Sequence, residues 1–351
     1  MHHMIEQART NLRSRLERYF REEAAEILRL SPWGPDVRRR LADYTQGGKL
    51  IRGSLVHVGF SLFHPDRPSP AACVEAGVAM ELIQSFLLVH DDIMDQDAIR
   101  RGSPAIHSQY ESALAAGPSE RAGQYGLSMG ICAGDVAAFL AMERLAALDT
   151  DHGNRQAILS LVSREIAVVG LAQMQDVHHG YIEAVPRQAI LDVYTYKTGR
   201  YTFSLPLMIG AILADASEER RRLLARFGEH VGRIFQIRDD YLGIFGASKD
   251  TGKPVGSDIR EDKQTLFRSL LFERTKDSDP VRRHFGSSRI DGAAIEEVRR
   301  ALADCGVLDE VKTIIGEDER AAAALIEELA VGEEGRAVLA TFVDYNVERT
   351  V

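Results

Sequence analysis

The chain has 351 residues, of which 45% are hydrophobic and 27% are charged, a composition typical of a soluble globular protein. Its formal net charge of −9 disfavours binding to nucleic acid and to anionic membrane surfaces, so we expect neither partner. Aromatic residues make up only 7%, while Ala, Leu, Arg and Glu recur, and this balance favours helix over sheet.

The three cysteines, Cys73, Cys132 and Cys305, are far apart and show no C-x-x-C spacing. They predict neither a disulfide framework nor a zinc site, which fits a cytoplasmic protein. The N-terminal segment has no apolar stretch or cleavage site typical of a signal peptide. Apolar runs such as Ser85–Val89 and Phe203–Ala214 are too short or too interrupted to cross a bilayer, so we expect no membrane span.

Apolar residues recur at three- and four-residue spacing, which is the periodicity of helices. The predicted helices, in chain order, cover residues 9–30, 37–44, 52–63, 70–95, 121–147, 153–178, 187–214, 217–245, 293–303, 306–314, 318–331 and 333–346. The segments Gly102–Ser119 and Gly246–Asp262 have no such pattern and are expected to be loops. Because we find no repeat and no domain boundary, the prediction is an all-α fold: one large helical bundle around a central cavity, a single domain over residues 1–351.

The first candidate site is the acidic motif that closes the helix predicted over 70–95. Asp91 and Asp95 are four residues apart and therefore point the same way on a helix, with Asp92 between them. Like charges about 4 Å apart repel by roughly 1 kcal/mol in water and by more near a protein surface. Mg2+, bound by carboxylates and substrate phosphates, would offset that repulsion. Taken alone, the motif is equally compatible with a solvated acidic helix end.

A second acidic cluster favours the functional interpretation. Gln236 and Asp240 are four residues apart with Asp239 beside them, again after an apolar helical run. Surface charge alone explains two such clusters poorly. If the two helices face one another, their carboxylates could hold a diphosphate group through bridging metal ions.

Cationic residues accompany both clusters. Lys49 and Arg52 stand three residues apart at a helix start, where free backbone N–H groups favour anions. The other candidates are Arg100 and Arg101 after the first cluster, Lys197 with Thr198 in Tyr-Lys-Thr-Gly, and Lys253 and Lys263 after the second cluster. Each of these alone is typical of an ordinary surface charge, but their joint arrangement indicates a polyanionic ligand.

From about residue 40 to 270 the chain resembles the trans-prenyltransferases, the polyprenyl (isoprenyl) diphosphate synthase family. The resemblance rests on ordered motifs: G-G-K-x-x-R at Gly47–Arg52, D-D-x-x-D at Asp91–Asp95, R-R-G at Arg100–Gly102, Q-x-x-D at Gln173–Asp176, K-T at Lys197–Thr198, F-Q-x-x-D-D at Phe235–Asp240, and the downstream Lys253 and Lys263. One departure is that the second motif usually reads D-D-x-x-D, whereas Gly243 stands here at its third acidic position.

The resemblance implies an Mg2+-dependent enzyme with three bound ions, two held by Asp91 and Asp95 and one by Asp239. It implies catalytic roles for Asp91, Asp92, Asp95, Arg100, Lys197, Asp239 and Asp240. The residues implied around the allylic diphosphate are Arg100, Lys197, Thr198, Gln236, Asp240, Lys253 and Lys263, and those around isopentenyl diphosphate are Lys49, Arg52, Gln84 and Arg101. It also implies a homodimer.

The implied reaction condenses isopentenyl diphosphate with an allylic diphosphate to give a short all-trans prenyl diphosphate. Phe86 and Leu87, just before the first acidic motif, are the expected determinants of chain length. A large aromatic residue at Phe86 resembles geranylgeranyl diphosphate synthases, and farnesyl diphosphate is the alternative product.

Three other functions compete with this one. A terpene cyclase would need a different second metal motif and no Gly47–Arg52 element. A non-catalytic partner subunit of another synthase could lose its acidic motifs, yet both are present here. His90-Asp91 with His178-His179 could suggest a metal phosphohydrolase, but the metal-ligand spacing is absent.

Overall fold

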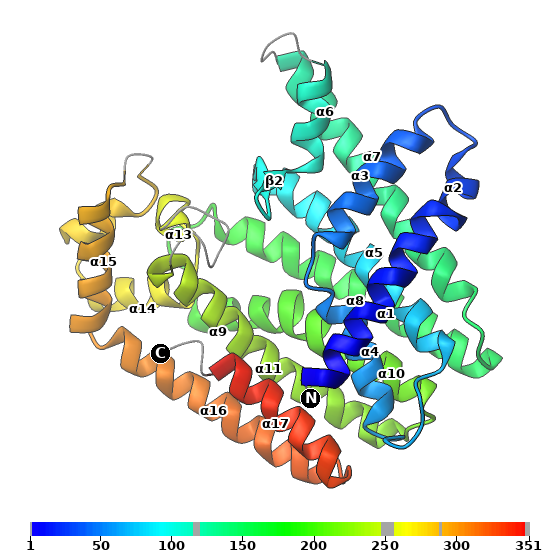
Figure 1. Ribbon diagram of the computed structural model, residues 1–351. Coiled ribbons are helices and arrows are strands. Elements are labelled where there is room, and N and C mark those ends of the chain that lie inside the picture. The colour runs from blue at the N-terminus through cyan, green and yellow to red at the C-terminus, as the bar shows by residue number, and fades with distance from the viewer. Residues whose placement is uncertain (1, 115–119, 247–255, 288–289, 348–351) are drawn as a thin grey trace. The chain divides into compact units, whose positions relative to one another are not determined.

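The computed structural model describes residues 2–114, 120–246, 256–287 and 290–347 (Figure 1). The chain divides into two compact units. Unit 1 comprises Met1–Val162 and Pro206–Ser217, and unit 2 comprises Ser163–Leu205 and Glu218–Val351. Across the described residues the only strands are two of two residues each, so the all-α prediction is confirmed. The single domain over 1–351 stays a prediction.

Unit 1 is built around an almost completely buried helix, α5 (Ala71–Met94). Met80 and Leu82 are fully buried at its centre. The helix α4 (Ile51–Ser61) packs very closely on α5, because a Cβ on Gly53 would lie only 2.8 Å from the carbonyl oxygen of Gly77. The remaining elements of unit 1 are α1 (His2–Arg21), α2 (Glu23–Leu28), α3 (Gly34–Gln46), β1 (Ile99–Arg100), β2 (Ser103–Pro104), α6 (Ile106–Leu114), α7 (Glu120–Ala146), α8 (His152–His179) up to Val162, and α10 (Leu205–Leu213) from Pro206.

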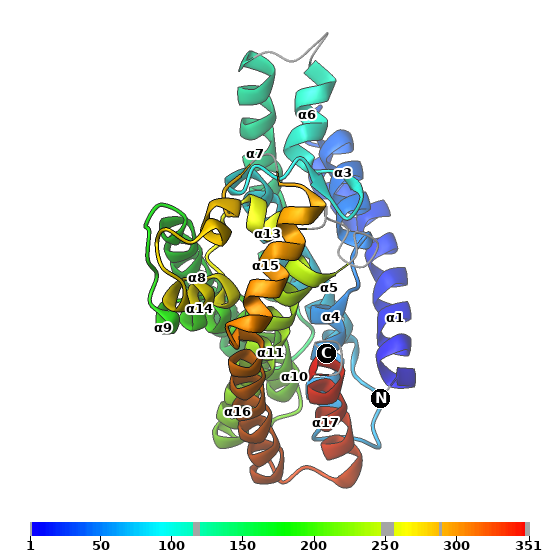
Figure 2. The ribbon, with the colours of Figure 1, turned by 90° about the vertical axis from the view of Figure 1, so that its left-hand side faces the viewer.

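In unit 2, helix α11 (Glu218–Phe245) carries the second acidic cluster. A π-helix, η1 (Tyr194–Ser204), packs against it so closely that a Cβ on Gly232 would lie 2.0 Å from the Cα of Gly199. The other elements are the rest of α8, α9 (Arg187–Val193), α13 (Ser257–Arg260), α14 (Leu266–Arg274), the 3-10 helix η2 (Pro280–His284), α15 (Gly292–Asp304), α16 (Val307–Glu328) and α17 (Glu333–Val347). Figures 1 and 2 show α16 and α17 side by side.

Most predicted helices are present, with three differences in continuity. The run over 9–30 is two helices, α1 and α2, and the run predicted over 187–214 is not one regular helix, because it contains the π-helix. The two helices predicted over 306–331 are one helix, α16, up to Glu328. The expectation that Gly102–Ser119 and Gly246–Asp262 are loops is wrong in part, because the first contains β2 and α6 and the second overlaps α13. The helices α14 and η2 and the strand β1 were not predicted either.

The expectation that every apolar segment is too short or too interrupted for a bilayer is wrong. Three stretches, Ala71–Met94, Arg121–Ala146 and His152–His179, are long and apolar enough to cross a membrane by length and composition alone. In the first, 72% of the most apolar window is buried within the protein, so its apolar character is that of a core helix. In the other two the buried shares are 39% and 28%, which leaves apolar side chains exposed.

Candidate active site

In unit 1, a tight hairpin places the two consecutive arginines. Strands β1 and β2 are antiparallel, with Arg100 opposite Ser103. The two residues of the turn, Arg101 and Gly102, have φ of 54° and 76°. A two-residue hairpin turn of type I′ has such left-handed backbone at both positions, and glycine adopts it without strain. The R-R-G sequence therefore encodes the turn as well as two cations.

Arg100 forms an ion-pair network with Asp92 of the first acidic motif and with Asp97. The Asp92 side chain is fully buried and accepts a hydrogen bond from Arg100 Nε at 2.5 Å. The Tyr44 hydroxyl donates to the other oxygen of Asp92 at 2.6 Å, and Asp97 contacts Arg100 Nη2 at 3.0 Å. Burial raises the pKa of Asp92 against the opposing charge of Arg100 and the Tyr44 hydrogen bond. Asp92 thus holds the hairpin and α3 on α5.

The two aspartates on either side of Asp92 are more accessible. Asp91 is half-buried, with its carboxylate 3.9 Å from Arg100, and Asp95 is exposed at the end of α5. Asp91 and Asp95 were predicted to point the same way, and both are more accessible than Asp92, whose side chain points into the protein. Of the three carboxylates, Asp91 and Asp95 are the ones available to a ligand.

In unit 1, the cations Arg52 and Arg101 lie near the buried carboxylate of Glu81. A Cβ on Gly48 would lie 2.8 Å from Arg101 Nη1, so the Gly-Gly-Lys segment adjoins the Arg101 guanidinium, which also donates to the Tyr44 carbonyl at 3.2 Å. Glu81, buried on α5, accepts the backbone N–H of Gly53 at 2.8 Å, in the first turn of α4. The charges of Arg52 and Arg101 act on Glu81, so this carboxylate anchors the start of α4 and offsets the two cations. Lys49 is exposed and Gln84 is buried.

The stability of the protein should depend on pH through Glu81. Burial raises the pKa of Glu81, and the hydrogen bonds and the arginine charges oppose that rise only in part. A raised folded-state pKa contributes stability at low pH, and this contribution is lost as pH rises through that pKa. We therefore expect Glu81→Gln to become more stable relative to the wild type as pH increases, measured by urea unfolding from about pH 4 to pH 8. A difference that does not change with pH would contradict this.

Phe86 lies on the side of α5 that carries His90. The two rings pack edge to face, with centroids 4.9 Å apart. His90 Nε2 is 3.1 Å from the carbonyl oxygen of Ile131 on α7, and a Cβ on Gly134 would lie 2.4 Å from the same nitrogen. Phe86 and the neighbouring Leu87 are both half-buried. The glycine on α7 makes room for the His90 ring that supports Phe86.

Unit 2 contains a continuous chain of hydrogen bonds that ends at a backbone group. The Thr198 hydroxyl donates to Gln236 Oε1 at 2.8 Å, and Gln236 Nε2 donates to Asp240 at 2.9 Å. The Tyr194 hydroxyl donates to the other Asp240 oxygen and accepts the backbone N–H of Leu266 at 2.9 Å. The chain links η1, α11 and α14, so it fixes Thr198 and Gln236 in position.

Asp240 is buried, whereas its neighbour Asp239 is exposed. Burial raises the pKa of Asp240 to about 7, and Lys263, Tyr194 and Gln236 oppose the rise while Asp258 adds to it. Asp240 therefore supports other side chains, and Asp239 is the carboxylate of this motif that a ligand can reach.

Lys197 forms an ion pair with Asp176 of the Q-x-x-D element, at 2.7 Å. Burial acts to raise the pKa of Asp176, but Lys197 and Lys263 outweigh it and the pKa is lowered. Two of the predicted cations thus act on one carboxylate. Lys253 lies outside the described residues.

The accessible carboxylates fit a hard divalent cation. Asp91, Asp95 and Asp239 offer oxygen donors only, which suits Mg2+. Among the described residues, no group of three or more His, Cys, Asp or Glu side chains could hold a metal by itself. A bound Mg2+ would therefore take most of its ligands from water and from phosphate oxygens, as Mg2+ usually does.

Sequence reasoning missed Tyr44, Glu81 and Tyr194. Each contacts a predicted site residue: Tyr44 contacts Asp92, Glu81 lies near Arg52, and Tyr194 contacts Asp240. The first acidic motif lies in unit 1 and the second in unit 2, so the expectation that the two motifs face one another stays a prediction.

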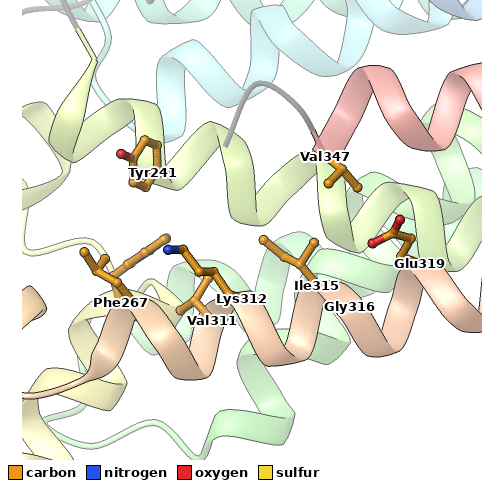
Figure 3. A pocket seen from close by; sticks show the side chains of 9 residues that line it. Tyr241, Phe267, Val311, Lys312, Ile315, Gly316, Glu319 and Val347 are labelled. Carbon is orange, nitrogen blue, oxygen red and sulfur yellow. The ribbon is translucent and has the colours of Figure 1, made fainter. Parts of the chain in front are cut away.

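A separate apolar pocket of about 250 Å³ in unit 2, lined by residues such as Tyr241, Phe267 and Ile315, contains none of the predicted site residues (Figure 3).

Comparison with known proteins identifies the family. The family model described as polyprenyl synthetase matches residues 36–303. The chain is 34% identical over 238 residues, 67% of this chain and 66% of the other, to a geranylgeranyl diphosphate synthase of Sulfolobus acidocaldarius. It is 31% identical to a short chain isoprenyl diphosphate synthase of Methanothermobacter thermautotrophicus, over 95% of this chain and 97% of the other.

Among solved structures, the geranylgeranyl pyrophosphate synthase of Corynebacterium glutamicum, complexed with isoprenyl diphosphate and magnesium, matches with a TM-score of 0.87 and 27% identity. The match covers 99% of this chain and 98% of the other. The fold is thus that of the all-α isoprenoid synthases. The chain belongs to the polyprenyl synthetase family, and the resemblance drawn from its motifs is confirmed.

Proposed function

We propose that this protein is an Mg2+-dependent prenyltransferase that condenses isopentenyl diphosphate with allylic diphosphates to give geranylgeranyl diphosphate. The observation that carries the proposal is that each acidic motif contains both accessible and buried carboxylates. Asp91, Asp95 and Asp239 are accessible, whereas Asp92 and Asp240 are buried and hydrogen-bonded to the side chains around them. The accessible carboxylates can bind a metal–diphosphate group, and the buried, hydrogen-bonded ones hold the surrounding side chains in place.

The residues that would hold Mg2+ are Asp91, Asp95 and Asp239. When bound, Mg2+ supplies Lewis-acid assistance and neutralises charge on the leaving diphosphate. Lys197, Thr198, Gln236 and Lys263 bind the allylic diphosphate, and Lys49, Arg52 and Arg101 bind that of isopentenyl diphosphate. The Glu81 carboxylate offsets the mutual repulsion of Arg52 and Arg101, so that both remain in place when no substrate is bound.

Cleavage of the allylic C–O bond leaves a delocalised carbocation and a diphosphate. Lys197 and Lys263 stabilise the negative charge that develops on the leaving group, because they are positioned before the reaction begins. The double bond of isopentenyl diphosphate then attacks the cation, and a proton is lost. The motifs contain no evident general base, so the departing diphosphate takes the proton.

The direct test is to incubate the purified chain alone with labelled isopentenyl diphosphate, several allylic starters and Mg2+, and to size the products. We expect a 20-carbon diphosphate, and we expect no product when the metal is chelated. A 15-carbon product would favour farnesyl diphosphate. Activity only in the presence of a second synthase would instead identify a non-catalytic partner subunit.

Chain length should respond to Phe86. We expect Phe86→Ala to give longer products, because removing the ring takes away a bulky side chain just before the first acidic motif. Product sizing of the variant and the wild type under the same conditions checks this. Phe20→Ala, which truncates a phenylalanine on α1, is the control for nonspecific loss of packing. Unchanged products in Phe86→Ala would remove Phe86 from chain-length control.

We also propose that the protein is a homodimer. On α7, the Phe139 and Ile131 side chains are 74% and 46% exposed, so a partner that covers them would remove large apolar groups from water. Light scattering should give twice the 38.9 kDa mass of one chain for the wild type, and a lower mass for Phe139→Glu. Equal masses of the two proteins would exclude this side chain from the interface.

A further inference from the structure

The π-helix η1 of unit 2 carries Lys197 and Thr198, two of the residues proposed to bind the allylic diphosphate. π-helical geometry is rare and occurs mostly as single turns within α-helices, often at functional sites. Because η1 extends over 11 residues, it needs contacts with neighbouring elements to maintain this geometry. On α11, a Cβ on Gly232 would lie only 2.0 Å from the Cα of Gly199, so the two backbones are in direct contact. On α8, two ion pairs hold η1.

Two cations of η1 bind two acids of α8. Lys197 Nζ lies 2.7 Å from Asp176. Arg200 donates from Nε and Nη2 to the two carboxylate oxygens of Glu165, at 2.8 and 2.6 Å. The cations are three residues apart in the chain, whereas the acids are 11 residues apart, which corresponds to about 16 Å along a helix. The two cationic side chains therefore diverge along α8, and together the ion pairs fix where η1 lies on it.

The two ion pairs differ in how they respond to a bound anion. Lys197 is a predicted ligand of the diphosphate, so a bound ligand competes with Asp176 for its charge. Arg200 is held at two nitrogens by one carboxylate, which fixes its orientation as well as its distance. Only 2% of the Glu165 side chain is exposed, and a buried acid is costly without such a partner. The hydrogen bonds with Glu165 raise the pKa of Arg200, so the arginine keeps its charge.

We propose that the Arg200–Glu165 ion pair positions Lys197 for the allylic diphosphate, by keeping η1 on α8 when the lysine turns to the ligand. Arg200 and Glu165 touch no substrate and act through the residues of η1. A lysine on a displaced η1 would approach the diphosphate from a different distance and angle, and a fixed charge stabilises a leaving group only from the right place. The inference rests on the proposed function and adds two positioning residues to its site.

The surroundings of Arg200 connect this pair to the second acidic motif. Glu229 of α11 lies 3.7 Å from Arg200 Nη1, and burial raises the pKa of Glu229 against the charge of the arginine. Arg200 therefore joins η1 to α11 as well as to α8. A displaced η1 would also move Thr198, whose hydroxyl donates to Gln236, and Gln236 donates to Asp240. Loss of the pair would thus change the diphosphate site without removing any residue predicted to bind substrate.

Calorimetry of inorganic diphosphate binding in the presence of Mg2+ tests the inference, together with the KM values of the two substrates. We expect Glu165→Gln, which keeps the shape of the side chain but not its charge, to weaken diphosphate binding about 10-fold, the lower end of the effect of residues that orient ligands. KM for the allylic diphosphate should rise by a similar factor. KM for isopentenyl diphosphate should stay nearly unchanged, because the residues predicted to bind it belong to unit 1. Glu218→Gln, the control, neutralises the acid of an exposed ion pair with Arg222 on α11 and should bind diphosphate as the wild type does.

A double-variant comparison distinguishes positioning from folding. If Arg200 acts through Lys197, Arg200→Met should lower kcat/KM for the allylic diphosphate about 10-fold in the wild type but less than about 3-fold in a Lys197→Met background. A pair that only stabilised the fold would lower the melting temperature and leave the affinity of the folded protein for diphosphate unchanged. Arg200→Lys, which keeps the charge but loses the two-point geometry, should fall between Arg200→Met and the wild type.

Thermal unfolding without ligand identifies variants that fail to fold, and Glu165→Gln and Arg200→Lys provide the test if Arg200→Met does so. Three results would overturn the inference. The first is wild-type diphosphate binding by Glu165→Gln, the second is effects of the Arg200 and Lys197 variants that simply multiply, and the third is a wild type that binds no diphosphate.

The two proposals can fail separately. If the wild type elongates allylic diphosphates but Glu165→Gln keeps wild-type diphosphate binding and KM, the role of the ion pair is wrong and the function stands. If the wild type produces no prenyl diphosphate yet Glu165→Gln weakens Mg2+-dependent diphosphate binding, the proposed function is wrong and the positioning of Lys197 for an anion stands.

Discussion

Replacing Asp92 by alanine is expected to destabilise the protein by about 3 kcal/mol, because it removes one partner of a buried ion pair and leaves the other charge poorly compensated. Asp92 is fully buried and joins the Arg100 guanidinium to the Tyr44 hydroxyl. Arg100 would keep Asp97 as a partner, which limits the loss. Urea unfolding of the variant and the wild type measures the difference.

The control for this prediction lies in the same motif. Asp95 is exposed at the end of α5, so Asp95→Ala should leave the free energy of unfolding nearly unchanged while reducing activity. The double variant Asp92→Ala with Arg100→Met should be less destabilised than the sum of its single changes, because it removes both charges of the pair. Equal unfolding free energies of Asp92→Ala and Asp95→Ala would show that Asp92 has no special structural role.

The side-chain directions within the first acidic motif could be predicted from sequence, because they depend only on the geometry of one helix. Four-residue spacing predicts that Asp91 and Asp95 share a direction, and the structure leaves both more accessible than Asp92 between them. What lies opposite Asp92 could not be predicted, because Tyr44 is 48 residues away in the chain. The same holds for Tyr194, whose hydroxyl meets the backbone of Leu266, 72 residues further on.

The errors in the predicted elements also have physical causes. The gap between the helices predicted over 306–314 and 318–331 contains Gly316, and glycine in a helix interior costs about 1 kcal/mol relative to alanine. Buried side chains on either side of it, such as Ile315 and Ala322, supply enough packing to keep α16 continuous. The π-helix η1 could not be read from apolar periodicity, and neither could the close contact of its Gly199 with Gly232 of α11, which joins two separate helices.

The second large effect is expected at Asp239. We expect Asp239→Asn to lower kcat by about 10²–10³, the magnitude seen when one preorganised electrostatic group is removed from an active site. Its thermal stability should match that of the wild type, because Asp239 is exposed and its change leaves the buried Asp240 network in place. Initial rates at saturating substrates and several Mg2+ concentrations measure the effect.

The neighbouring aspartate separates metal binding from a structural role. Asp240→Asn removes the acid that accepts hydrogen bonds from Tyr194 and Gln236, so it should lower the melting temperature as well as the rate. If both variants lost activity only in proportion to lost stability, Asp239 would have no direct part in the reaction. A direct action on the metal would give a different result: Asp239→Asn would be as stable as the wild type but would need more Mg2+ for half-maximal rate. A substitution that only disturbed packing would lower the stability and leave the Mg2+ dependence unchanged.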